Sequence, residues 1–143
     1  MSVRIYYEDT DVAGVVYYAN YLRYLERART EWLRAAGWDL ATLQRNDDAV
    51  FVVRRIEADY LQPARLGDLL SVTCEPEAVG ASRIDIRQRV LRGHELLLQA
   101  RVIAAYIGAS DGRPRRMPER MRSSLQDEPR VQARRLTAPD SPS

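Results

Sequence analysis

A short acidic run near the amino terminus has the residue types needed for acid–base or nucleophilic chemistry: residues 8–11 read Glu-Asp-Thr-Asp. It is followed by Gly14 and, from Asn20, by apolar residues at helical spacing. The first backbone N–H groups of a helix are unpaired and carry about half a positive charge, so they can polarise a carbonyl or hold an oxyanion. Gly14 lets another molecule's backbone or acyl group approach closely. The spacing alone leaves open whether Asp9 and Asp11 take part in such chemistry or only cap turns.

The single histidine and the single cysteine limit the other possibilities. A zinc site of the usual type needs three or four such ligands, so we predict no metal site of this kind and no cofactor. Cys74 falls on the apolar side of a predicted strand, where a thiol packs as a small hydrophobe. His94 falls in a predicted turn, where we expect it to be solvated.

Residues 108–112 match the Gly-x-Ser-x-Gly pattern of serine hydrolases, with Ser110 at the place of the nucleophile. That pattern works as a strand-to-helix elbow, with an acid and then a histidine later in the chain. Here Gly112-Arg113-Pro114 follows, a sequence unsuited to starting a long helix, and no histidine lies downstream. We interpret the match as a chance product of a glycine-rich turn.

One long amphipathic helix is predicted after the acidic run, because apolar residues recur at helical spacing from residue 20 to about residue 36. Asn20 is a good N-cap, and Gly37 stands where a left-handed residue ends a helix. This is the only strong helical pattern, and residues 45–48 are predicted to form a polar loop. The predicted apolar face comprises Tyr21, Leu22, Leu25, Ala28, Trp32, Leu33 and Ala36.

Alternation of apolar and polar residues predicts β-strands before and after this helix. The predicted strands are residues 3–8, 56–60, 70–75, 84–90 and 96–107, with a hairpin turn at residues 92–95. We expect the last four to follow one another as a meander in an antiparallel sheet, with the helix across its concave face. The final strand becomes apolar on both faces, so the edge and final strands are suited to pairing with a second subunit.

The composition is that of one globular domain followed by a tail. Residues 1–126 form the domain, and residues 127–143, rich in proline, serine and arginine, are predicted to be disordered. All 22 basic residues are arginine, which suits phosphate binding but is explained as well by coding bias. No aromatic residue follows Tyr106 to stack on bases, so we predict no nucleic-acid partner.

We also expect a cytoplasmic protein without a membrane span. The longest apolar stretch, residues 102–109, has eight residues, whereas a membrane-spanning helix needs about 20. No amino-terminal segment combines a charged start, an apolar centre and a small-residue cleavage site. A single cysteine suits a reducing compartment.

The acidic run lies within a longer segment that resembles a known family. Residues 4–22 and 26–31 resemble the signature of the YbgC-like, Tol-Pal-associated acyl-CoA thioesterases, which belong with 4-hydroxybenzoyl-CoA thioesterase in the hotdog superfamily. The resemblance spans about residues 3–120 and also includes residues 51–55, 60–68 and Arg113-Pro114. A match of this length is far more specific than any short motif, and it favours a catalytic role for the acidic run.

The resemblance implies both a fold and an assembly. The implied fold is α+β and of the hotdog type, in which an antiparallel five-stranded sheet wraps around one long central helix. The implied assembly is a homodimer or a homotetramer, with each acyl pocket at a subunit interface. Tol-Pal-linked proteins of the cell envelope are further partners to test for.

The resemblance further implies that the protein hydrolyses an acyl-CoA to the free acid and CoA. Asp11 would be the catalytic carboxylate, and the backbone N–H of Tyr18 would polarise the thioester carbonyl. The residues between them would line the substrate, namely Gly14, Val15, Val16 and Tyr17. Because the leaving thiol has a pKa of about 8.5, it departs as a thiolate without a general acid. One carboxylate therefore suffices, and its role as general base or as nucleophile stays open.

One position departs from the pattern of the family. Many YbgC-like members have histidine where this chain has Tyr18, although 4-hydroxybenzoyl-CoA thioesterase also has tyrosine there. The role of that histidine is therefore not carried over, and a catalytically weak acyl-CoA-binding or scaffold protein is the alternative function. A hydratase of the same fold would need a histidine with its carboxylate, and His94 lies far from the acidic run in the sequence.

Overall fold

The computed structural model describes residues 1–11 and 13–127 of the chain. Within them the fold is α+β. The elements in chain order are β1 (Ser2–Arg4), the 3₁₀ helix η1 (Tyr7–Asp9), α1 (Asn20–Ala35), α2 (Leu40–Asp47), β2 (Ala49–Tyr60), β3 (Leu69–Val72), β4 (Glu75–Val79), β5 (Arg83–Arg92), β6 (Glu95–Gly108) and α3 (Glu119–Asp127). The predicted disordered tail falls outside the described residues, apart from Asp127, which ends α3.

The strands form one antiparallel sheet in the order β1-β3-β5-β6-β2, and β4 also pairs with β5. β3 pairs with the end of β5, where Val72 lies opposite Val90. β4 pairs with the beginning of β5, where Glu75 lies opposite Arg87. β3 and β4 therefore occupy one position in the sheet. The predicted antiparallel sheet is confirmed, with six strands in its five positions, because the strand predicted at residues 70–75 ends at Val72 and a separate strand, β4, begins at Glu75.

The predicted meander is wrong at β2. This strand pairs along its length with β6, the last strand, rather than with β3, which follows it in the chain. β6 consequently lies inside the sheet, and β2 is its edge. The physical reason is burial, because β6 is apolar on both faces and mostly buried, as an interior strand is. The final strand is thus covered by its neighbours and offers no free edge to a second subunit.

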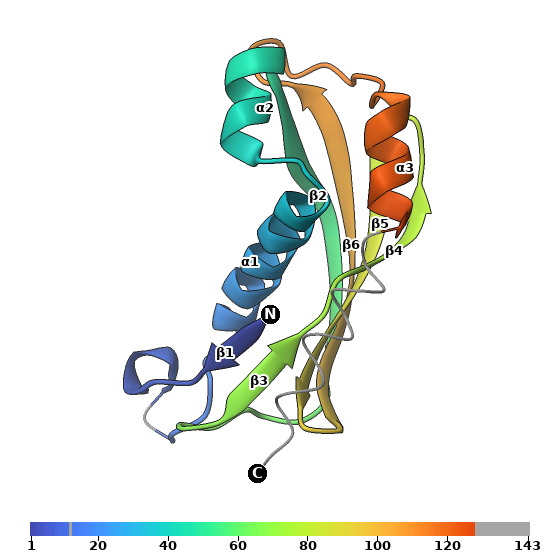
Figure 1. Ribbon diagram of the computed structural model, residues 1–143. Coiled ribbons are helices and arrows are strands. Elements are labelled where there is room, and N and C mark those ends of the chain that lie inside the picture. The colour runs from blue at the N-terminus through green and yellow to red at the C-terminus, as the bar shows by residue number, and fades with distance from the viewer. Residues whose placement is uncertain (12, 128–143) are drawn as a thin grey trace.

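The three α-helices pack on one face of the curled sheet (Figure 1). Side chains from all three share a core cluster with inward residues of β5 and β6, including Trp32 of α1, Leu43 of α2 and Met121 of α3. A second cluster joins the first half of α1 to β1, β3, β5 and β6. This is the hotdog arrangement that the resemblance implied, with α1 as its long central helix.

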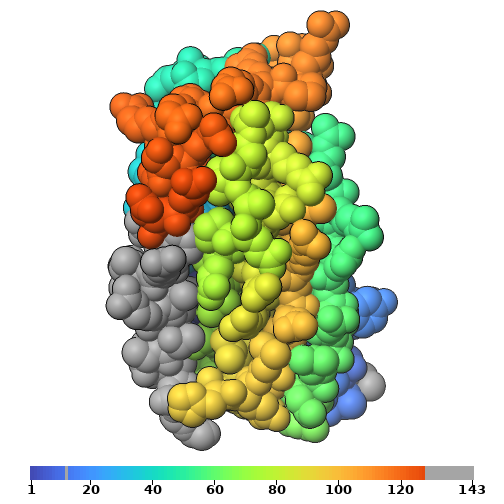
Figure 2. Space-filling model, turned by 90° about the vertical axis from the view of Figure 1, so that its right-hand side faces the viewer, coloured from blue at the N-terminus to red at the C-terminus, as the bar shows by residue number. Residues whose placement is uncertain are grey.

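None of the described helices covers the opposite face of the sheet, where β4, β5, β6 and β2 form the surface and α3 lies beside β4 (Figure 2). The alternation in β5 predicted a charged face here, and the charges pair both across and along the strands. Arg87 of β5 lies 2.8 Å from Glu77 of β4, and Arg83 lies 2.8 Å from Asp85 on the same strand. The hydrogen bonds from Arg83, followed by the charge of Arg101, hold the pKa of Asp85 below its usual range.

The apolar face predicted for α1 is confirmed except at Leu22, which is 40% exposed. Gly37 ends the helix with φ +98°, as predicted. Tyr24 is buried as well, although it was not assigned to this face. The buried residues of α1 are Tyr21, Tyr24, Leu25, Ala28, Trp32 and Leu33.

Two helices were missed by the sequence analysis. α2 begins before the predicted polar loop and includes most of it, and it buries only Leu43. α3 buries only Met121 and Leu125. Helices that bury so few residues leave a weak periodic pattern, which explains the omission. None of the helices within the described residues is long and apolar enough to cross a membrane.

Two strand boundaries were also wrong. β2 begins at Ala49 rather than at residue 56, because a shift of register between Val53 and Arg55 breaks the alternation. The first predicted strand, residues 3–8, is shorter than expected, since β1 ends at Arg4 and the chain then turns into η1. The acidic run therefore leaves the sheet early, which places it beside the start of α1.

Candidate active site

Asp11 lies in a tight turn that leads toward α1. Its N–H donates to the Val15 carbonyl at 2.9 Å, and its carbonyl accepts the Gly14 N–H at 3.0 Å. One carboxylate oxygen accepts the Ala13 N–H at 2.8 Å, and the other has no hydrogen bond to any described residue. Gly14 has φ +78°, a conformation that strains residues with a side chain. The turn thus presents an exposed carboxylate, one oxygen of which has no partner in the part of the chain that the structure describes.

Asp9, in contrast, is a structural link between the acidic run and the helix. Its backbone carbonyl accepts the Tyr17 N–H at 3.1 Å and the Asn20 side-chain amide at 2.9 Å. Its carboxylate accepts the Tyr6 N–H at 3.0 Å. Burial and then the charge of Asp9 raise the pKa of Tyr24. Asp9 therefore fits the turn-capping role, and Asp11 is the carboxylate that remains available for chemistry.

The start of α1 is open. Its N-cap is Ala19, and no side chain caps the helix; Asn20, predicted as the N-cap, bonds instead to the Asp9 carbonyl. The N–H groups of Tyr18 and Ala19 have no acceptor within the described residues, whereas the Asn20 N–H donates to the Tyr17 carbonyl at 2.9 Å. The first turn also carries no acidic side chain. The N–H groups of Asn20, Tyr21 and Leu22 in the first turn donate to carbonyls three residues earlier, so the unpaired donors are those of Tyr18 and Ala19, immediately before the positive end of the helix.

An apolar groove of about 460 Å³ lies beside Tyr18. The Tyr60 ring makes edge-on contacts with Tyr18 and Tyr21, at centroid distances of 6.2 and 5.6 Å. Burial raises the pKa of both Tyr21 and Tyr60, so both phenols are neutral at physiological pH. The lining contains no charged side chain, which suits an uncharged acyl group. The groove is lined by Val16, Tyr18, Tyr21, Tyr60, Leu61, Gln62 and Pro63.

The structure brings the predicted site residues into one turn and helix start. Gly14 and Val15 are half-buried in the turn, and Val16 is buried and lines the groove. Tyr17 and Tyr18 are 49% and 62% exposed.

Sequence reasoning missed the other wall of the groove. Tyr21 was assigned to the apolar face of the helix, and Tyr60 to the end of a strand. No spacing rule connects residues 21 and 60, because only the folded sheet brings the end of β2 to the start of α1.

The residues that the sequence analysis set aside lie where it expected them. Cys74 is buried in the core, where burial raises the pKa of its thiol. His94 is exposed in the turn between β5 and β6. The Ser110 hydroxyl donates to the Asp48 carboxylate in a turn, and the next helix begins only at Glu119. Within residues 1–11 and 13–127, no cluster of acidic, histidine or cysteine side chains could hold a metal ion.

Comparison with known proteins finds relatives along most of the chain. The family described as the thioesterase-like superfamily matches residues 6–125. The acyl-CoA thioesterase YbgC of Haemophilus influenzae is 39% identical over 123 residues, which cover 86% of this chain and 90% of that protein. The acyl-CoA thioester hydrolase YbgC of Escherichia coli O157:H7 is 37% identical over 118 residues, 82% and 87% of the two chains. A solved structure of a probable thioesterase from Bartonella henselae has a TM-score of 0.78 and 36% identity, covering 82% of this chain and 97% of that chain.

Proposed function

This chain belongs to the thioesterase-like superfamily, and on that premise we propose that it hydrolyses the thioester bond of an acyl-CoA, releasing a free acid and CoA. Two relatives at 39% and 37% identity are named acyl-CoA thioesterase and acyl-CoA thioester hydrolase. The observation that carries the proposal is an exposed carboxylate, Asp11, in the turn that leads to the N–H groups of Tyr18 and Ala19, which lie immediately before α1 and lack acceptors among the described residues.

In the proposed reaction the thioester carbonyl accepts a hydrogen bond from the Tyr18 N–H. The positive end of α1 stabilises the negative charge that develops on this oxygen, and one such donor is typically worth about 10²–10³ in rate. Asp11 either takes a proton from the attacking water or attacks the carbonyl carbon itself, forming a mixed anhydride that water then hydrolyses. In both routes the carbon–sulfur bond breaks with its electron pair on sulfur, and CoA leaves as the thiolate.

We assign the acyl group of the substrate to the groove beside Tyr18. Its lining is apolar, aromatic and uncharged, so it favours uncharged acyl groups over dicarboxylic ones. Gly14, Val15 and Tyr17 are proposed to line the thioester and its approach. The absence of a side chain at Gly14 leaves room for the substrate where the turn is tightest.

For the assembly we propose a homodimer formed through the edge strand β2, or a homotetramer of two such dimers. Among the described strands, none pairs with the outer edge of β2 along Ala49–Tyr60, and Val53 on this strand is 42% exposed. A long free edge with apolar residues pairs readily with another chain. Tyr60 ends this strand and lines the groove, so a partner on β2 would lie beside the acyl site. Light scattering at micromolar concentration is expected to give a dimer or tetramer, and a monomer would contradict this proposal.

The alternative function is a catalytically weak acyl-CoA-binding or scaffold protein. It is favoured by Tyr18 at a position where many YbgC-like proteins have histidine. A panel of acyl-CoAs separates the two functions, because the enzyme releases CoA whereas a binding protein only retains the ligand. A cytoplasmic location rests on sequence features such as the single cysteine, and an association with Tol-Pal-linked envelope proteins rests on the resemblance alone. Fractionation tests the first, and co-purification tests the second.

The substitution Asp11→Asn tests the proposed mechanism. Asparagine keeps an oxygen to accept the Ala13 N–H but is neither a base nor a nucleophile. Turnover is therefore expected to fall by at least about 10², with acyl-CoA binding largely retained. If Asp11 only capped the turn, the variant would be nearly silent, since asparagine caps about as well as aspartate.

Asp9→Asn is the matched control for this experiment. It removes the same charge from the same acidic run and keeps an acceptor for the Tyr6 N–H. A general loss of negative charge would change the binding of CoA phosphates alike in both variants. Wild-type turnover in Asp11→Asn together with lost turnover in Asp9→Asn would refute the assignment.

A further inference from the structure

The turn that carries the carboxylate is held by a distant segment, residues 60–68, here named the 60–68 loop. The Val16 N–H donates to the Ala64 carbonyl at 2.8 Å. The Leu66 N–H donates to the Gly14 carbonyl at 3.2 Å. These two bonds join the far side of the turn to the loop, so the place of the turn depends on the place of the loop.

The same loop also holds the start of α1. The Ala64 N–H donates to the Tyr21 hydroxyl at 3.0 Å, in the first full turn of the helix. The Tyr60 hydroxyl donates to the Tyr18 carbonyl at 3.4 Å. The two parts of the candidate site, the carboxylate turn and the helix N–H groups, therefore share one support.

The 60–68 loop has no strand or helix of its own between β2 and β3. Its second half is folded around Asp68, whose carboxylate accepts the Arg65 N–H at 2.8 Å and whose N–H donates to the Arg65 carbonyl at 3.0 Å. On one side of the loop, Arg4 of β1 donates to the Gly67 carbonyl at 2.8 Å. Backbone bonds fix the two ends of the loop, from the Leu61 N–H to the Leu97 carbonyl at 2.8 Å and from the Gly67 N–H to the Ile5 carbonyl at 2.9 Å, and a side chain from the sheet adds a hold on the part between them.

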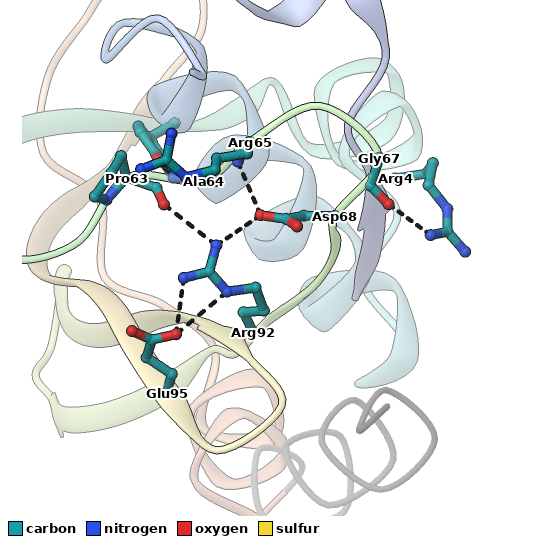
Figure 3. A network of polar contacts seen from close by, with 9 residues as sticks. Arg4, Pro63, Ala64, Arg65, Gly67, Asp68, Arg92 and Glu95 are labelled. Atoms are coloured by element: carbon teal, nitrogen blue, oxygen red, sulfur yellow. Dashed lines mark hydrogen bonds and ion pairs between the residues drawn. The ribbon is translucent and has the colours of Figure 1, made fainter. Parts of the chain in front are cut away.

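Arg92, the last residue of β5, supplies that hold (Figure 3). Its Nη1 donates to the Asp68 carboxylate at 2.7 Å and to the Pro63 carbonyl at 3.3 Å. Its Nη2 and Nε donate to the Glu95 carboxylate at 2.7 and 3.2 Å. The side chain of Arg92 is 27% exposed and that of Asp68 is 21% exposed, so water screens this pair less than a surface pair. One guanidinium thus ties two points of the loop to the β5–β6 hairpin.

We propose that Arg92 is a positioning residue for the thioesterase site, acting with Asp68 through the 60–68 loop. By holding Pro63 and Asp68 it sets the position of Ala64 and Leu66, and these fix the turn of Asp11 and the start of α1. The proposal rests on the proposed function for its kinetic consequence, but its structural consequence is independent of that function. Arginine is required because its planar fork bonds several acceptors at once, which the single ammonium group of lysine does not reproduce.

Arg87, on the same strand, is a matched control. Its Nε donates to Glu77 at 2.8 Å on the outer face of the sheet, so it also makes a charged pair from β5. Glu77 lies on β4, away from the 60–68 loop. Losing Arg87 removes a comparable ion pair without touching the candidate site.

Hydrogen–deuterium exchange tests the positioning role directly, on the full chain. Arg92→Ala is expected to speed the exchange of amides in residues 13–22 and 60–68, and Arg92→Lys to give an intermediate effect. Arg87→Ala is expected to leave both segments as in the wild type. Equal exchange of residues 13–22 in Arg92→Ala and wild type would overturn the proposal. Arg92→Lys gives the same test if Arg92→Ala fails to fold.

Steady-state kinetics of CoA release give the second readout. Arg92→Ala is expected to lower kcat about tenfold or more with little change in KM, because a small misplacement of reacting groups lowers the rate more than binding. Arg92→Lys recovers part of the loss, and adding Asp68→Asn to Arg92→Ala adds little, since both substitutions break one network. Equal losses in Arg92→Ala and Arg87→Ala would reduce Arg92 to a general stabiliser and overturn the proposal. If the wild-type protein releases no CoA, the proposed function fails, and the exchange experiment still decides the positioning role.

Discussion

At its carboxyl end α1 is closed by the residues that follow it, whereas at its amino end it is left open. The N–H groups of Ala36, Gly37 and Trp38 return to carbonyls of the last turn at 3.1, 3.0 and 2.8 Å. Arg34 in that turn complements the negative end of the helix dipole. At the other end no side chain caps the helix, and Tyr18 presents an N–H without an acceptor in the described part of the chain.

The two ends of α1 also differ in how deeply their aromatic side chains are buried. Near the carboxyl end Trp32 is fully buried, and the Trp38 indole donates to Ser124 of α3 at 2.7 Å. At the amino end the rings of Tyr17 and Tyr18 stack on each other, at a centroid distance of 4.8 Å, and are half or more exposed. The carboxyl end of α1 is therefore part of the core, whereas its amino end lies at the surface, where we propose that the ligand binds.

The helix α2 gives a comparison within the same chain, because its start is capped and no catalytic role is proposed for it. Its N-cap, Asp39, accepts the Thr42 N–H at 3.1 Å and the Thr42 hydroxyl at 3.0 Å. A carboxylate cap of this kind at α1 would place a negative charge beside the Tyr18 N–H, the donor that we assign to the thioester carbonyl. The difference between the starts of α1 and α2 shows that a missing cap can mark a functional helix end, because a bound ligand can then supply the hydrogen-bond acceptor.

The largest contrast is expected from removing one aromatic ring at each end of α1. Trp32→Ala is expected to lower the free energy of unfolding by about 3–5 kcal/mol, because it empties a fully buried site. Tyr18→Ala is expected to change it by less than about 1 kcal/mol, since the ring is mostly exposed. Urea unfolding measures both values. Equal destabilisation by the two variants would show that the amino end is part of the core after all.

Two glycines with positive φ give a sharper comparison. Gly14, with φ +78°, lies in the carboxylate turn, and Gly37, with φ +98°, ends α1; an added Cβ would meet no atom within 4 Å at either. Alanine at either position is therefore expected to cost about 1–2 kcal/mol through backbone strain alone. Only Gly14→Ala is expected to lower kcat as well. A loss of kcat in Gly37→Ala equal to that in Gly14→Ala would remove the functional distinction between the two ends.

Adding one carboxylate at each end of α1 tests the open start. Ala19→Asp is expected to raise stability by about 0.3–1 kcal/mol, because a negative charge complements the positive helix end. It is also expected to lower kcat/KM, since the new carboxylate competes for the free N–H groups and repels the developing oxyanion.

Ala35→Asp is the control, at an exposed position in the last turn. It is expected to lower stability by a similar amount and to leave kcat/KM unchanged. Thermal unfolding and CoA release measure the two effects. An Ala19→Asp variant with full activity would argue against the use of these N–H groups.

The smallest effect is expected at the capped start of α2, and it depends on pH. Hydrogen bonds from Thr42 hold the pKa of Asp39 below its usual value. A lowered carboxyl pKa in the folded state contributes stability above the unfolded-state value, and this contribution is lost as the pH falls through the folded-state value. Asp39→Ala is therefore expected to lower the melting temperature slightly above about pH 5, and the difference from the wild type is expected to shrink only as the pH falls below about 4 toward the lowered folded-state pKa. A difference that persists at low pH would show that packing, not the charge-dependent cap, is responsible.

The sequence by itself determined the local features, and the reason is that their signals lie within one or two turns of the chain. The buried stripe of α1 follows from apolar residues spaced three and four apart, and Gly37 marks its end because only glycine takes that φ without strain. The outward charges of β5 follow from alternation. The acidic run was recognised as the candidate site because it matches a known family signature over a long segment.

Only the tertiary structure decided how these parts meet. The pairing of β2 with β6, the bond from Asn20 to the Asp9 carbonyl and the hold of Arg92 on Pro63 and Asp68 all join residues that no local pattern relates. Asn20 is a good N-cap by its residue type, but in the folded chain it is the first residue of the helix, and its side-chain amide donates to the Asp9 carbonyl. Contacts of this kind depend on which surfaces the whole sheet buries against α1, and that is a property of the assembled core rather than of any single segment.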